Sequence, residues 1–142
     1  MSLNTIRDQV GEINKKNGFH TVEFNLGEKL MLVTTELAEC LEAHRIGHHS
    51  NLDDFQKRYQ EIVDSTNTTL IPENSQEYEA RKVQVFKNTF KKYVKEGVEA
   101  EIGDAMIRLF DIAFLMNIDL DKMISAILYN NSLREYMHGK KY

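Results

Sequence analysis

The chain has 142 residues, 42% of them hydrophobic, and its 18 basic and 22 acidic side chains give a net charge of −4. This length predicts a single domain, residues 1–142, and the acidic balance argues against a nucleic-acid-binding surface, which needs a basic face. A single cysteine, Cys40, excludes an intramolecular disulfide. No run approaches the roughly 18 apolar residues of a membrane span, and residues 1–10 lack the apolar core of a signal peptide. We therefore expect a cytoplasmic protein without a membrane or nucleic-acid partner.

The N-terminal third predicts two helices. The first covers residues 3–17 and ends at Gly18, a residue type favoured just after a helix. Asn25 followed by Glu28 resembles a capping box, and it begins a second helix over residues 26–45. Apolar side chains at spacings of 3 and 4 along this second helix predict the face that is turned to the core. The members of this stripe are Leu26, Leu30, Val33, Leu37, Leu41 and His44.

The rest of the chain also predicts helices. Residues 48–96 are more polar and contain a short helix around Phe55 and Tyr59, a loop with the single proline, Pro72, and a helix over residues 77–96. Residues 98–117 form the most apolar helix, and Asp119 caps a last one. Alternation typical of strands is lacking, so we predict an all-α helical bundle.

Carboxylates interrupt the most apolar helix. Glu101, Asp104, Arg108 and Asp111 recur at spacings of 3, 4 and 3, which places them on one face. An ionised carboxylate buried without a partner costs several kcal/mol, so this face must meet solvent, a counter-charge or a cation. We expect Arg108 and Asp111 to form an internal ion pair.

The second helix carries a matching pair, Glu36 and Glu39. Two helices that each present carboxylates at i and i+3 can bring four of them together. Such a cluster suits hard divalent cations, and a pair of Mg²⁺ ions is a common device of phosphoryl chemistry. The alternative is that the carboxylates are simply solvated.

Two other metal sites have weaker support. A di-iron carboxylate bundle needs two Glu-x-x-His pairs, whereas the chain has one, Glu135–His138. A zinc site at His44, His48 and His49 lacks a supporting cysteine or carboxylate pattern.

The acidic motifs also carry a family resemblance. Glu36-Leu-Ala-Glu39 followed by Glu101-Ile-Gly-Asp104 resembles the signature of the MazG-like all-α nucleoside triphosphate pyrophosphohydrolases. The segments 17–19, 131–134 and 138–141 resemble further family motifs, so the resemblance covers residues 1–47 and 97–141. It implies a MazG-like helical bundle in which residues 48–96 are an inserted helical segment between the two acidic helices. A lysine common in relatives, one turn before the Asn-x-x-Arg asparagine, is replaced by Ile127.

The resemblance implies a function. We expect Mg²⁺-dependent hydrolysis of nucleoside triphosphates, with ribose or deoxyribose, to the monophosphate and pyrophosphate, in the house-cleaning of nucleotide pools. Mn²⁺ is expected to substitute for Mg²⁺, and the chain to form a homodimer or homotetramer. The alternatives are a hydrolase of other pyrophosphate compounds and a non-enzymatic helical interaction module. The expected metal ligands are Glu36, Glu39, Glu101 and Asp104, the expected general base is Glu39, and the expected substrate contacts are Asn131, Arg134, His20 and Lys140.

Overall fold

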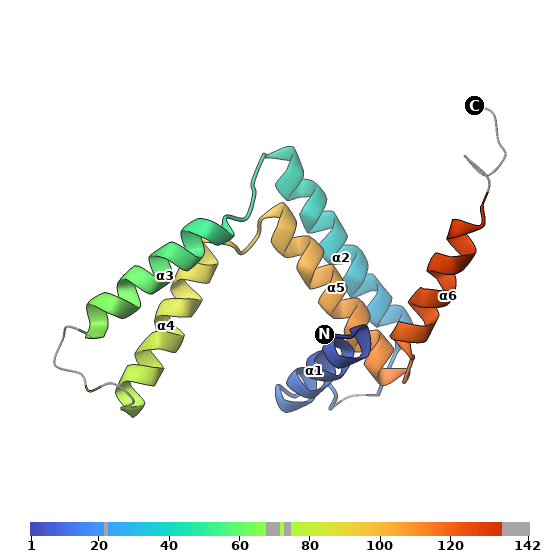
Figure 1. Cartoon of the computed structure of the whole chain (residues 1–142), viewed down its shortest axis with the longest axis horizontal. Coiled ribbons are helices and arrows are strands. Elements are labelled where there is room, and N and C mark those ends of the chain that lie inside the picture. Colours follow the sequence, from blue (N-terminus) through green and yellow to red (C-terminus); the bar gives the residue numbers. More distant parts are fainter. Residues whose placement is uncertain (22, 68–71, 73–74, 135–142) are drawn as a thin grey trace. The chain divides into compact units, whose positions relative to one another are not determined.

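The computed structural model describes residues 1–21, 23–67, 72 and 75–134. Helices are the only regular elements in this part of the chain, so the predicted all-α fold class is confirmed (Figure 1). Within the same residues, no helix has both the length and the apolar content to cross a membrane. The helices are α1 Leu3–Lys16, α2 Leu26–Arg45, α3 Leu52–Asn67, α4 Gln76–Tyr93, α5 Val98–Leu115 and α6 Leu120–Ser132.

The chain folds into two compact units. Unit 1 comprises Met1–Met31 together with Met106–Tyr142, and unit 2 comprises Leu32–Ala105. The boundaries fall inside α2 and α5, each of which contributes one part to each unit. No change of composition marks this division in the sequence, because each boundary lies within a continuous helical pattern.

Side-chain caps begin five of the helices, and at the start of α3 Asn51 Oδ1 accepts a hydrogen bond from the N–H of Asp54 at 2.9 Å. Oxygens of Ser2, Ser75 and Asp119 accept hydrogen bonds from backbone N–H groups three residues further on, at the starts of α1, α4 and α6. Asn25 Oδ1 accepts a hydrogen bond from the N–H of Glu28 at 3.2 Å, so the predicted cap of α2 is present. Each cap satisfies a backbone donor that a helix leaves unpaired in its first turn.

Two helices end earlier than the sequence predicts. The helix expected over residues 77–96 ends at Tyr93, and the one expected over residues 98–117 ends at Leu115. Glu96 and Asn117 have φ angles of +66° and +51°. This left-handed conformation cannot continue an α-helix, and it is rare enough for side chains other than glycine that the sequence did not suggest it.

In unit 1 the start of α1 is fastened to the start of α6. The N–H of Leu3 donates to Asp121 Oδ1 at 2.9 Å, and Asn4 Oδ1 accepts from the N–H of Leu120 at 2.8 Å. Arg7 donates to the carbonyl of Ile118 at 2.6 Å, just before α6. Side chains from each helix therefore satisfy backbone groups that the first turn of the other leaves free.

Gly11 allows α1 to approach α5 closely. A Cβ atom at Gly11 would overlap the ring of Phe114, whereas one at Gly103 of α5 would meet nothing within 4 Å. We expect Gly11→Ala to destabilise the protein by about 1–3 kcal/mol through overpacking. The same change at Gly103 should stabilise it by roughly 0.5–1 kcal/mol, because alanine favours a helix interior. Urea unfolding of the two variants measures both changes in the free energy of unfolding. Changes of the same sign would contradict the Gly11 contact.

In unit 2 Ser50 joins the α3–α4 hairpin to the start of α5. Its hydroxyl donates to the carbonyl of Val94 at 2.7 Å, and its N–H donates to the Glu99 carboxylate at 2.8 Å. The hydrogen bond to His49, followed by the one from Ser50, lowers the pKa of Glu99 to about 2. A Cβ atom at Gly97 would overlap Ser50, so this close approach needs glycine.

The predicted core stripe of α2 is not buried within the single chain. Of its members only Val33, at 8%, is buried, whereas Leu30, Leu37 and Leu41 are 46%, 53% and 51% exposed. The buried residues of α2 are Val33, Glu36 and Ala43. Periodicity identifies the apolar face of a helix but not the surface that covers it, and the prediction that this stripe faces the chain's own core is therefore wrong.

Candidate metal centre

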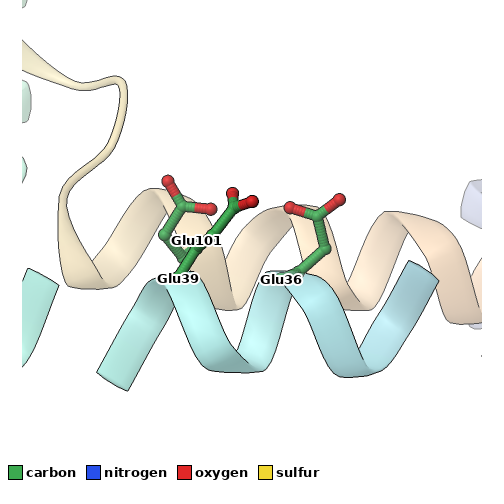
Figure 2. Close-up of side chains that lie close together, drawn as sticks. All are labelled: Glu36, Glu39 and Glu101. Atoms are coloured by element: carbon green, nitrogen blue, oxygen red, sulfur yellow. The ribbon is translucent and has the colours of Figure 1, made fainter. Parts of the chain in front are cut away.

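Three of the four predicted metal ligands lie together in unit 2. Glu36 and Glu39 project from α2, and Glu101 projects from the neighbouring α5. One carboxylate oxygen from each lies within 4.8 Å of the others. Figure 2 shows the three carboxylates pointing to the same side of the two helices. The i, i+3 spacing on α2 and the side-by-side packing of the two helices therefore create one acidic cluster.

Glu101 is the most deeply placed carboxylate of the cluster. It is 4% exposed. Burial raises the pKa of Glu101, and the charges of Glu39 and Asp104 raise it further. Burying an ionised carboxylate costs free energy, and a cation bound beside Glu101 would offset this cost.

Glu36 and Glu39 differ in exposure. Glu36 is 8% exposed, and Glu39, one turn further along α2, is exposed. The cluster thus has two buried carboxylates and one that reaches solvent. This arrangement can hold a cation from the protein side and leave its outer coordination positions for water or a ligand.

Asp104 lies outside this three-carboxylate group. Its side chain is exposed, one turn beyond Glu101 on α5, and its charge raises the pKa of Glu101. Asp104 is therefore close enough to act on the cluster electrostatically. Its place as a fourth ligand stays a prediction.

The donor set fits a hard divalent cation. Carboxylate oxygens suit Mg²⁺ and Mn²⁺, whereas zinc sites are built from histidine and cysteine as well. In the described part of the chain, the cluster of Glu36, Glu39 and Glu101 is the only group of such side chains close enough to share an ion. His49 contacts Glu99 instead, so the zinc alternative gains no support.

His20, a predicted substrate contact, belongs to a buried ionic cluster in unit 1. Its Nε2 lies 2.7 Å from Asp111 Oδ1, and its ring stacks on Phe114. Lys29 Nζ donates to the other Asp111 oxygen at 2.8 Å. Burial raises the pKa of Asp111, but hydrogen bonds from Lys29, Asn14 and His20 outweigh it and leave the pKa below its usual value.

This cluster was only partly visible in the sequence. Asp111 was expected to pair with Arg108, whereas the structure gives it Lys29 and His20 as partners. The three residues clamp the link between α1 and α2, and the first turn of α2, onto α5. Lys29 lies about two helical turns before Glu36 on α2, and this spacing indicated in the sequence that the two side chains project from the same side of the helix.

The other predicted substrate contacts lie near the C-terminus. Asn131, in the last turn of α6, and Arg134, just after it, are both exposed and belong to unit 1. Lys140 and His138 lie outside the described residues. The structure thus assembles the carboxylate cluster, and the substrate contacts stay predictions.

Comparisons of the chain with protein-family models, curated proteins and solved structures found no match. The geometry of the carboxylate cluster in unit 2 is therefore what the structure contributes to the question of function.

Proposed function

We propose that the protein is a Mg²⁺-dependent nucleoside triphosphate pyrophosphohydrolase with its metal site at Glu36, Glu39 and Glu101. The observation that carries the proposal is the buried carboxylate of Glu101 beside two further carboxylates on α2. The Glu-x-x-Glu and Glu-x-x-Asp motifs that contain them resemble those of the MazG-like enzymes, which supports the assignment of the reaction. The reaction would release pyrophosphate and leave a nucleoside monophosphate.

The exposure of each carboxylate suggests its part in the reaction. Glu101 and Glu36, which are buried, would hold the cation from the protein side, and the exposed Asp104 would complete the ligand set. Glu39 reaches solvent and is the best placed to accept the proton of an attacking water. A bound Mg²⁺ would lower the pKa of that water and offset the negative charge of the phosphates.

The assay is release of pyrophosphate from a panel of ribo- and deoxyribonucleoside triphosphates, in Mg²⁺ and in EDTA. We expect turnover of at least one nucleotide that EDTA abolishes. Glu36→Gln combined with Asp104→Asn should lower kcat/KM by at least about 100-fold, the upper range for loss of a group that merely supports a ligand. Glu42→Gln, an exposed carboxylate of α2 outside the cluster, is the matched control.

Two results would contradict different parts of the proposal. The absence of turnover with every nucleotide in Mg²⁺ would contradict the enzymatic function and favour a non-enzymatic interaction module. Turnover that survives the double substitution would leave the activity standing but contradict the site.

A second copy of the chain is the expected partner. Leu37 and Leu41 lie one turn apart on α2 and are 53% and 51% exposed. Large apolar side chains that are exposed side by side are typical of surfaces that associate. We therefore propose a homodimer or homotetramer in which these two leucines are covered, and light scattering that shows a monomer at every concentration would contradict it.

A further inference from the structure

One face of the α3–α4 hairpin carries an uncovered apolar stripe. Val83, Phe86 and Phe90 follow one another on α4 at spacings of 3 and 4, so they share a face. They are 52%, 45% and 36% exposed. Three large apolar side chains in a row on a short hairpin form a patch rather than scattered exposed residues.

The patch is held in place by aromatic rings of both helices. Phe86 and Phe90 stack with ring centroids 5.9 Å apart, and both meet the ring of Phe55 edge to face, at 5.2 and 5.8 Å. Tyr59 stacks on Phe55 and meets the edge of Phe86. Because Phe55 is buried beneath them, the exposed rings lose little freedom when a partner covers them.

The hairpin is joined to the rest of unit 2 at its base. Hydrogen bonds there connect Ser50 with Val94, Glu99 and Ala100, and Asn51 with Tyr93. Val83 lies two to three turns further along α4 from this junction. These hydrogen bonds lie away from the stripe, whose side chains stay partly exposed.

The two helices of the hairpin have opposite charges. α3 carries four acidic and two basic side chains, whereas α4 carries two acidic and five basic ones. The hairpin is therefore complementary to itself when a two-fold axis places α3 of one copy against α4 of the other. A nucleic acid would be attracted by α4 but repelled by α3, so the charge pattern favours a second copy of this chain.

We propose that this face is a homotypic interface, in which the Val83, Phe86 and Phe90 stripes of two copies pack together across a two-fold axis. A two-fold contact uses the same patch twice and closes on itself, so it forms a defined oligomer and not a filament. None of the proposed metal ligands lies on the hairpin. The interface is thus independent of the catalytic proposal and distinct from the α2 stripe.

The test is the mass of the full chain by sedimentation or native mass spectrometry. Val83→Glu should raise the dissociation constant of one association step by at least about 10-fold. At protein concentrations near the wild-type dissociation constant, the mass of the variant should fall toward half. Gln84→Glu places the same charge on the neighbouring exposed position of α4 and should leave the mass unchanged. Circular dichroism checks that both variants keep their helices.

A charge exchange tests the orientation without touching the stripe. Lys87→Glu with Lys91→Glu reverses exposed charges of α4, and Asp53→Lys with Asp64→Lys reverses exposed charges of α3. Each variant alone should associate less, and an equal mixture should recover the wild-type mass. This result would stand even if no nucleotide were hydrolysed.

Two outcomes would overturn the interface. One is an unchanged mass for Val83→Glu, and the other is an equal loss of mass for Gln84→Glu. If the mass of Val83→Glu is unchanged and the protein binds a 20-nucleotide single-stranded DNA, and Lys87→Glu abolishes that binding, α4 is assigned to nucleic acid.

Discussion

Replacing Glu101 with glutamine is expected to raise the stability of the protein in EDTA and to abolish its stabilisation by Mg²⁺. Glu101 is 4% exposed, and its pKa is raised by burial and by Glu39. The amide has nearly the same shape but removes one ionised group from the cluster, so repulsion between the carboxylates falls. It also removes a charged ligand, so the affinity for Mg²⁺ should fall by at least about 100-fold.

Thermal unfolding in EDTA and in Mg²⁺ separates these two effects. A cation present at 100 times its Kd stabilises a folded protein by about 2.7 kcal/mol, which is a shift of roughly 10 °C for a chain of this size. Wild type and the control Glu42→Gln should both show this shift. A Glu101→Gln protein that is less stable in EDTA, or that Mg²⁺ still stabilises, would show that Glu101 has a structural role and is not a ligand.

Replacing Asp111 with asparagine should cause the largest loss of stability. The carboxylate oxygens of Asp111 lie 2.8 Å from Lys29 Nζ and 2.7 Å from His20 Nε2, and Asp111 is 3% exposed. The amide keeps the shape but leaves the largely buried Lys29 ammonium without its counter-charge. Removing one partner of a buried ion pair costs about 3 kcal/mol or more, so Tm should fall by roughly 10 °C.

The same carboxylate predicts how stability depends on pH. Because the folded-state pKa of Asp111 lies below the ordinary value of 3.8, its contribution is complete above that value. It is lost as the pH falls through the folded-state pKa. Wild type should therefore lose its advantage over Asp111→Asn below pH 3.8. Glu12→Gln, on the exposed surface of α1, should have no comparable effect on Tm, and a similar fall for both variants would contradict the clamp.

Local signals in the sequence predicted most of the helices. The starts of α1, α2, α4 and α6 lie at or within a residue of their expected positions, because a cap and the first turn involve residues only three or four apart. The ends of α4 and α5 were less predictable. Glu96 and Asn117 adopt left-handed conformations that depend on how the chain leaves the helix, and their residue types do not require it.

The candidate site shows the same division between local pattern and packing. The i, i+3 spacing of Glu36 with Glu39 predicted that both project from neighbouring faces of α2, and three of the four expected ligands do lie together. The spacing did not show that Glu36 and Glu101 are buried whereas Asp104 is exposed. That difference depends on which faces of α2 and α5 meet.

The four carboxylates, the helices that carry them and the all-α fold class were determined by the sequence itself. These features depend on helical periodicity, which acts within a few residues of the chain. Only the tertiary structure decided that α2 buries Val33, Glu36 and Ala43 in place of its leucine stripe, and that Asp111 pairs with Lys29 and His20. Many pairings of apolar faces and charges satisfy the same pattern, and the packing of segments far apart in the chain selects among them.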